Sequence, residues 1–140
     1  MARIKIAMPD QYLFSTILPI QITDINYGSH LANDKVLSMM HEARIRFFNH
    51  FDCSELDLKG VSVIMGDVAI EFKSEGFYGQ SLKIEVTAAE FRSKSFDMFY
   101  KFTNQETGKI LAHAKTGIVC FNYDTRQTKQ VPESFRKIFL

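Results

Sequence analysis

The chain has 140 residues, and 46% of them are hydrophobic, which suits a single domain over residues 1–140 with one core. Its 17 Lys and Arg residues nearly balance 16 Asp and Glu residues, so the formal net charge of +1 argues against nucleic acid or an anionic membrane as a partner. Only Cys53 and Cys120 are cysteines, and no run is apolar enough for a signal peptide or a membrane span, so we expect a cytoplasmic protein without a disulfide framework.

The first predicted element is a strand over residues 15–23. It is filled with β-branched and apolar residues, and Pro19 interrupts it, which is typical of an edge strand or a bent strand. A polar loop follows at residues 24–33, where Asn, Gly, Ser and Asp gather at the density of a turn or a functional loop. Because this loop holds the most chemically active residues, we expect the functional site there.

A long α-helix is predicted over residues 34–51. Its apolar residues recur at spacings of four, three, four and four, as one face of a helix requires, and Leu37 and Phe48 widen that face. Asn33 is expected to be the N-cap, because its side-chain oxygen can accept a backbone N–H of the first turn. Asp34 would then complement the positive end of the helix dipole. The residues of the repeating face are Val36, Met40, Ala43, Phe47 and Phe51.

Alternating apolar residues after the helix predict four strands. The strands span residues 61–73, 82–92, 95–103 and 109–123. One face of the third strand carries Phe96, Met98, Tyr100 and Phe102. The links between the last three strands are as short as hairpin loops, so these strands should pair antiparallel. Pro132 precedes a last short helix, which would place Phe135 and Phe139 on one side.

A strand, a long helix and four further strands make an α+β pattern in two layers. Neither the helix nor an antiparallel five-stranded sheet can bury its apolar face alone, so we expect the sheet to wrap around one long central helix. Such a sheet keeps an open edge and a partly apolar surface. A second copy of the chain can cover both, which predicts a homodimer or homotetramer.

The loop DINYGSHLAN at residues 24–33 resembles the D-x-D-x-x-G-H-V-N-N loop of the hotdog-fold acyl-CoA thioesterases, the 4-hydroxybenzoyl-CoA thioesterase-like superfamily. The helix then carries EAR at residues 42–44, where many members have E-x-R or E-A-R. Further matches are Gly79 with Leu82, residues 115–121 and Pro132. The resemblance covers nearly the whole chain. It implies a hotdog fold and hydrolysis of an acyl thioester of CoA, or of a carrier, to the free acid and thiol without a cofactor.

The same resemblance places the family's usual catalytic carboxylate at Asn26. An amide can orient water or hold a carbonyl, but it cannot take a proton near neutral pH, so a hydrolase would need another base. The candidates are Asp24, Glu42 and His30. Asp24 can instead be a turn cap, and Glu42 can instead pair with Arg46 at i,i+4. His30 can instead hydrogen-bond within the loop.

A substrate carbonyl would meet the loop and the start of the helix. Free N–H groups and the positive dipole end at a helix N-terminus suit a developing oxyanion. Gly28 either lets a ligand approach the backbone or provides a positive φ. The resulting set of predicted substrate contacts is Tyr27, Gly28, Ser29 and Asn33, of which Asn33 is better explained as the helix cap.

The remaining charged residues are interpreted as surface residues. Asp67 interrupts a predicted strand and is more simply solvent-facing than pocket-lining. Arg44 and Lys115 can meet a CoA phosphate, but surface charge is the simpler explanation. The other histidines do not converge with Cys or Glu at ligand spacing, so no metal site is predicted.

Two other functions stay open from the sequence alone. A non-catalytic acyl-thioester binding protein fits Asn26 at the position of the carboxylate. A hotdog dehydratase uses a His with a carboxylate, and His30 with Glu42 can imitate that pair. Release of free thiol from acyl-CoA substrates distinguishes hydrolysis from both alternatives.

Overall fold

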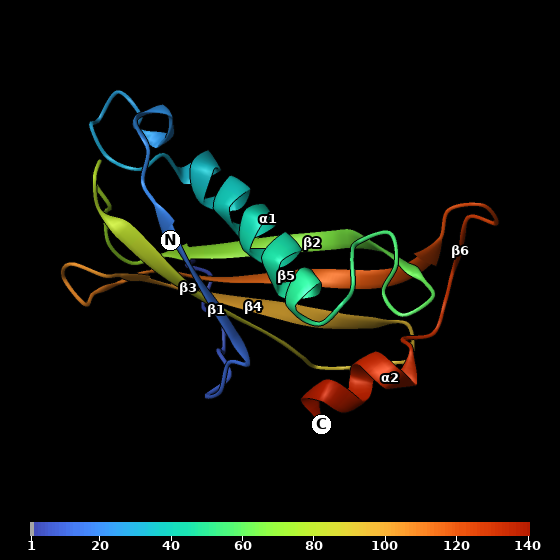
Figure 1. Ribbon diagram of the computed structural model, residues 1–140. Helices are drawn as coiled ribbons and strands as arrows, with labels where there is room; N and C mark the ends of the chain where they lie inside the picture. The colour runs from blue at the N-terminus through green and yellow to red at the C-terminus, as the bar shows by residue number, and fades with distance from the viewer. Residues whose placement is uncertain (1) are drawn as a thin grey trace.

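The computed structural model describes residues 2–140, and its main feature is an antiparallel sheet crossed by one long helix (Figure 1). The strands lie in the order β1 (Phe14–Pro19), β3 (Ser81–Ala89), β4 (Ser95–Asn104), β5 (Ile110–Asn122) and β2 (Ser62–Phe72). Each pairs antiparallel with its neighbours. A short strand, β6 (Gln127–Thr128), pairs with the end of β5. The predicted α+β fold of five strands and one long helix is therefore confirmed, with β6 as an addition.

The hydrophobic core lies between α1 (Asn33–His50) and the sheet face that this helix covers (Figure 1). The alternating residues of β4 that the sequence placed on one face are all fully buried, namely Phe96, Met98, Tyr100 and Phe102. Each layer thus buries the apolar side of the other. No helix within residues 2–140 combines the length and the apolar character needed to cross a membrane.

The start of α1 differs from the prediction, because the N-cap is Ala32 and not Asn33. The carbonyl oxygen of Ala32 accepts the N–H group of Val36, so Asn33 already lies in the first turn and makes no side-chain cap. Leu37 does not widen the buried face either, since it is 38% exposed while Met39 is buried. Leu37 is rotated by about 100° from Val36 around the helix axis, which turns it away from the core.

The first strand ends earlier than predicted. Pro19 closes β1, and the chain then makes one turn of 3-10 helix, Ile22–Asp24, instead of extending to residue 23. Proline has no N–H group for a sheet ladder, which explains the stop. β1 pairs only with β3 and is an edge strand, as its sequence predicts.

The other edge of the sheet is β2, whose pairing register with β5 shifts between Met65 and Asp67. The carboxylate of Asp67 accepts hydrogen bonds from Lys115 Nζ at 2.9 Å and from the Gly117 N–H at 2.8 Å. The hydrogen bond from Lys115 is the main reason that the pKa of Asp67 lies below its usual value. Asp67 is nevertheless exposed, so the prediction of a solvent-facing residue is confirmed.

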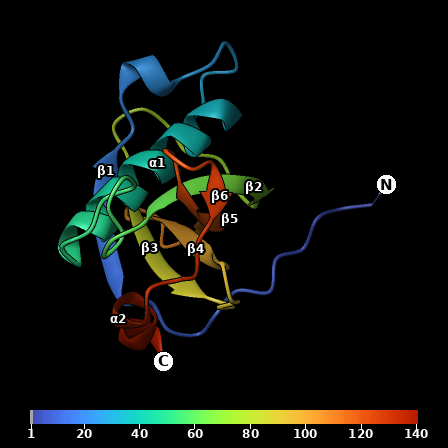
Figure 2. The same cartoon turned by 90° about the vertical axis from the view of Figure 1, so that its right-hand side faces the viewer.

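The C-terminal segment forms the short helix expected after Pro132. It consists of α2 (Glu133–Arg136) followed by a 3-10 turn, Lys137–Phe139. Phe135 is fully buried, and Phe139 packs against the same core. The Phe135 ring packs against Phe48 of α1 and Phe96 of β4, so this segment lies at one end of the sheet, next to α1 (Figures 1 and 2).

Candidate active site

The loop between the 3-10 turn and α1 is closed by Asn26. The backbone N–H of Asn26 donates to the His30 carbonyl at 3.0 Å, and a bridge joins Ile25 to Leu31. The side-chain oxygen of Asn26 accepts the N–H groups of Gly28 at 2.9 Å and His30 at 3.4 Å. Asn26 thus holds the loop from inside, as an Asx turn does.

The backbone of this loop departs from the expectation for Gly28. The residue with positive φ is Ser29, at 67°, and Gly28 is not among the glycines with positive φ. A Cβ atom on Gly28 would lie 3.2 Å from Asn26 Oδ1 and 3.3 Å from the His30 ring. Gly28 therefore allows a close approach, but the groups that it accommodates are its own neighbours in the loop.

Asp24 and Glu42 line one cavity beside α1, which we name the Glu42 cavity. It measures about 280 Å³, and its other walls are Leu18, Pro19, Gln21, Ser38, Met39 and Arg46. Asp24 Oδ2 accepts the N–H of Gln21 at 2.8 Å, and Glu42 Oε2 accepts a hydrogen bond from Arg46 Nε at 2.8 Å. Asp24 thus caps a turn and Glu42 pairs with Arg46, which are the non-catalytic roles that the sequence suggested for them.

His30 lines a different cavity, which we name the His30 cavity. It measures about 270 Å³ and lies between the start of α1, the end of β2 and the chain that follows β2. Its apolar walls are Leu31, Val36, Phe72 and Leu111, and its polar or small ones are His30, Asn33, Lys73, Ser74, Glu75 and Gly76. His30 and Glu42 therefore line different cavities of the chain.

The proton positions on His30 follow from its contacts. Its Nδ1 lies 3.0 Å from the carbonyl oxygen of Leu31, and a carbonyl can only accept, so Nδ1 carries the proton of the neutral ring. Nε2 is then the atom with a free lone pair. It lies 3.9 Å from Glu75 Oε1, which is too far for a hydrogen bond.

Gly76 fixes the far wall of the His30 cavity. Its carbonyl oxygen accepts the N–H of Leu31 at 2.8 Å. A Cβ atom on Gly76 would lie 2.7 Å from Ile20 Cδ1 and 2.9 Å from Leu111 Cδ1, so only glycine fits here without displacement of its neighbours. The chain after β2 is thereby held against the residue that follows His30.

The sequence matches the family model of the thioesterase-like superfamily over residues 20–139. The chain belongs to this superfamily. Among curated proteins, none matches the sequence. The family membership confirms the resemblance that the loop and helix motifs suggested.

Solved structures similar to this thioesterase-like chain include a 1,4-dihydroxy-2-naphthoyl-CoA thioesterase from Synechocystis, 19% identical, with 89% of this chain and 93% of that chain covered and a TM-score of 0.79. A thioesterase superfamily protein from a Jannaschia species is 17% identical, with coverages of 94% and 83% and a TM-score of 0.83. A hypothetical protein from Staphylococcus aureus, solved in complex with CoA, is 18% identical, with coverages of 95% and 84% and a TM-score of 0.78. These likenesses confirm the hotdog fold.

The four predicted substrate contacts of the thioesterase-like chain do not lie together in one cavity. Asn33 lines the His30 cavity, at the first turn of α1. Tyr27 is fully exposed, and Tyr27, Gly28 and Ser29 line neither the His30 cavity nor the Glu42 cavity. Sequence reasoning missed Glu75 and Phe72, because neither belongs to the loop motif and their approach to His30 depends on how β2 ends.

Arg44 is the clearest correction among the charged residues, since it is buried and not a surface charge. Its guanidinium donates to the hydroxyl of Tyr100 at 3.3 Å and lies 3.5 Å from a carboxylate oxygen of Glu55. Lys115 pairs with Asp67 and lines neither cavity described above. Within residues 2–140, no group of three or more His, Cys, Asp or Glu side chains is placed to hold a metal ion.

Proposed function

We propose that the chain hydrolyses an acyl-CoA thioester at the His30 cavity. The observation that carries this proposal is the meeting of His30 Nε2 and the first turn of α1 around one space with apolar walls. A proton acceptor, an oxyanion-binding helix end and room for an acyl group are what thioester hydrolysis requires. Membership of the thioesterase-like superfamily supports this reaction class, and CoA thioesterases among the solved relatives support CoA as the carrier.

In the proposed reaction, His30 Nε2 removes a proton from water as the water oxygen attacks the thioester carbonyl carbon. The carbonyl oxygen becomes an oxyanion, which the N–H group of Asn33 at the start of α1 stabilises. The C–S bond then breaks, the free acid forms, and the protonated ring returns its proton to the CoA thiolate. Glu75 Oε1 lies 3.9 Å from Nε2, the atom that takes up the proton.

Asn26 has a structural part in this proposal. Its side-chain oxygen fixes the backbone of His30 and so orients the ring. Asp24 and Glu42, the other two candidates for the base, are assigned to the Glu42 cavity and its contacts. The missing carboxylate of the family loop is thus replaced by an imidazole four residues further on.

Free-thiol release from a panel of acyl-CoA substrates tests the function. We expect thiol release in proportion to enzyme, with at least one acyl group cleaved well above the rate without protein. A chain that binds acyl-CoA but releases no thiol would be an acyl-thioester binding protein. A chain that changes only a 3-hydroxyacyl substrate, and does so without thiol release, would be a dehydratase.

We also propose that the chain works as a homodimer or homotetramer. Within residues 2–140, no strand pairs with the outer side of the edge strand β2, and its side chains Met65 and Val68 are 44% and 39% exposed. An open edge with apolar side chains favours association with a second copy. Light scattering at micromolar concentration should give at least twice the chain mass of 16.1 kDa. A stable monomer under these conditions would contradict the proposal.

For the domain organisation and the location, our proposals are those made from the sequence. We propose that residues 1–140 work as one domain in the cytoplasm. One core cluster extends from Leu18 to Phe135, which supports a single folding unit. Cys53 and Cys120 are free and buried, which is consistent with a reducing compartment.

A further inference from the structure

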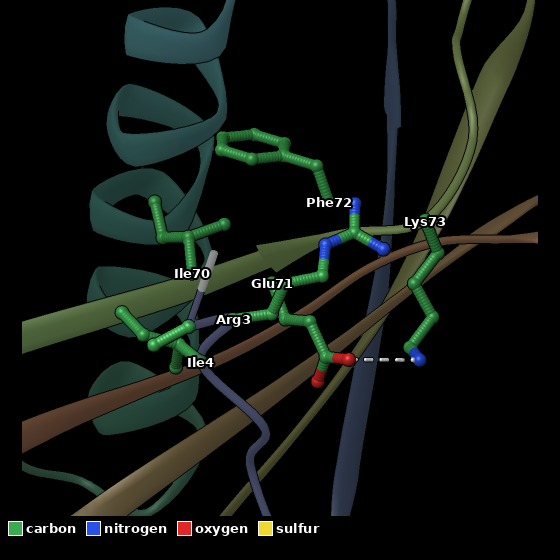
Figure 3. A pocket seen from close by; sticks show the side chains of 7 residues that line it. Arg3, Ile4, Ile70, Glu71, Phe72 and Lys73 are labelled. Carbon is green, nitrogen blue, oxygen red and sulfur yellow. Dashed lines mark ion pairs between the residues drawn. The ribbon is translucent and has the colours of Figure 1, made fainter.

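A second hollow lies beside the His30 cavity, and the proposed hydrolysis does not use it. Arg3 and Ile4 of the N-terminal segment approach residues 70–73 at the end of β2, and together they line an open hollow of about 570 Å³ (Figure 3). The segment is held there by a hydrogen bond from the Ile6 N–H to Glu71 Oε1 at 3.3 Å. We name this space the Arg3 hollow.

The Arg3 hollow and the His30 cavity are neighbours. Both are lined by Phe72 and Lys73, so these two residues form the boundary between them. A ligand in the His30 cavity that extends over Phe72 would reach the Arg3 hollow. An acyl-CoA has this extended form, with the acyl group at one end and a nucleotide at the other.

The chemistry of the hollow suits a phosphorylated nucleotide. Arg3 forms no ion pair within residues 2–140, so its guanidinium is free to bind a phosphate through two parallel hydrogen bonds. Lys73 adds a second positive charge to the lining, and its ammonium points toward Glu71 (Figure 3). The exposed ring of Phe72, 41% accessible, and the side chain of Ile4 offer apolar surface on which a purine can stack.

We infer that the Arg3 hollow binds the phosphorylated adenosine end of CoA, with Arg3 and Lys73 on its phosphates and Phe72 against its base. This assignment rests on the proposed function. It implies that the acyl group of the substrate is carried by CoA and not by a carrier protein. The hollow measures about 570 Å³, within the size range of small-molecule sites.

The negative charge of Glu71 repels an anion in this hollow. Removal of that charge should therefore strengthen the binding of a phosphorylated ligand, which makes the direction of the effect a test of the inference. Its carboxylate lies 3.1 Å from Lys73 Nζ, as the dashed line in Figure 3 shows. The hydrogen bond from Lys73 lowers the pKa of Glu71, so the carboxylate is ionised at neutral pH. Glutamine at this position removes the negative charge and releases Lys73, yet its side-chain oxygen can still accept the Ile6 N–H.

Calorimetric titration of the full-length chain with adenosine 3′,5′-bisphosphate tests the inference without any turnover. Arg3→Gln should raise Kd on the order of 10-fold, because one charged phosphate contact is lost. Glu71→Gln should lower Kd by about 3-fold. Lys5→Gln, a matched loss of charge on the same segment but outside the hollow, should change Kd by less than about 2-fold.

Any of three results would overturn the inference: no binding of this nucleotide by the wild type at millimolar concentration, equal effects of Arg3→Gln and Lys5→Gln, or weaker binding by Glu71→Gln. A kinetic ratio gives a second readout. Arg3→Gln should lower the ratio of kcat/KM for an acyl-CoA to that for the same acyl-pantetheine, and Lys5→Gln should preserve it. Nucleotide binding without any thioester cleavage would remove the proposed function alone, and cleavage without nucleotide binding would remove this inference alone.

Discussion

Replacement of His30 by glutamine is expected to lower kcat for thioester hydrolysis on the order of 10²-fold or more, with KM little changed. Glutamine can still donate a hydrogen bond to the Leu31 carbonyl, so the loop keeps its shape, but an amide cannot take the proton of the attacking water. Steady-state release of free thiol, on an acyl-CoA that the wild type cleaves, measures the effect.

His41→Gln is the matched control for this variant. His41 lies exposed on α1, where its ring contacts Glu55, and it lines neither cavity. Its replacement should leave kcat within about twofold of the wild type. Full activity of His30→Gln, together with a large loss in Asp24→Asn or Glu42→Gln, would move the base to the Glu42 cavity and contradict the proposed site.

The Asn26→Asp variant tests whether a carboxylate at the family's usual position in this loop can act as the base. A carboxylate oxygen can accept the same N–H groups of Gly28 and His30, so the loop should keep its shape. Higher turnover in Asn26→Asp would mean that the native site is less active, or more specialised, than a site that carries the family's carboxylate. Unchanged turnover is the result expected if His30 already supplies the base.

Phe135→Ala is expected to lower the free energy of unfolding by about 3–5 kcal/mol, the usual cost of removing a fully buried aromatic ring. The ring centroid of Phe135 lies 6.4 Å from that of Phe48 on α1 and 5.2 Å from that of Phe96 on β4. It also lies 5.1 Å from the ring of Phe139. Loss of this one side chain therefore leaves a cavity where helix, sheet and C-terminal segment meet.

Urea unfolding at neutral pH, followed by circular dichroism, measures this loss. Leu140→Ala is the control in the same segment, because Leu140 is 82% exposed and should change the unfolding free energy by no more than about 0.5 kcal/mol. A similar small change for Phe135→Ala would show that the C-terminal segment does not complete the core.

Local patterns in the sequence were sufficient to predict the layers of the fold. Alternation along β4 and the spacing along α1 both reflect burial on one side of an element, which is the dominant stabilising effect. The cap at Asn33 was predicted wrongly because the helix start depends on backbone bonding by Ala32, which has no side-chain signal. Arg44 was placed on the surface because its partner Tyr100 is distant in sequence.

The position of the candidate site was predictable only in part. The loop motif directed attention to residues 24–33, but sequence proximity does not show that Asp24 and His30 line separate cavities. The two cavities lie against different residues of α1: Asn33 and Val36 line the His30 cavity, whereas Ser38, Met39, Glu42 and Arg46 line the Glu42 cavity. Glu75 and Phe72 approach His30 only through the pairing of β2 with β5 and the bond from Leu31 to Gly76, neither of which a local motif encodes.

The buried guanidinium of Arg44 has a consequence for substrate range. It ties the middle of α1 to Tyr100 in the sheet, and the Tyr100 hydroxyl in turn lies 2.8 Å from Thr116 Oγ1 on the next strand. Sliding the helix along the sheet would strip a buried charge of its partners, which is strongly unfavourable. Movement of α1 is therefore a poor way to lengthen the space beside Val36. Substitutions in the walls of that space should therefore alter which acyl chain lengths are accepted. Movement of α1 relative to the sheet should not.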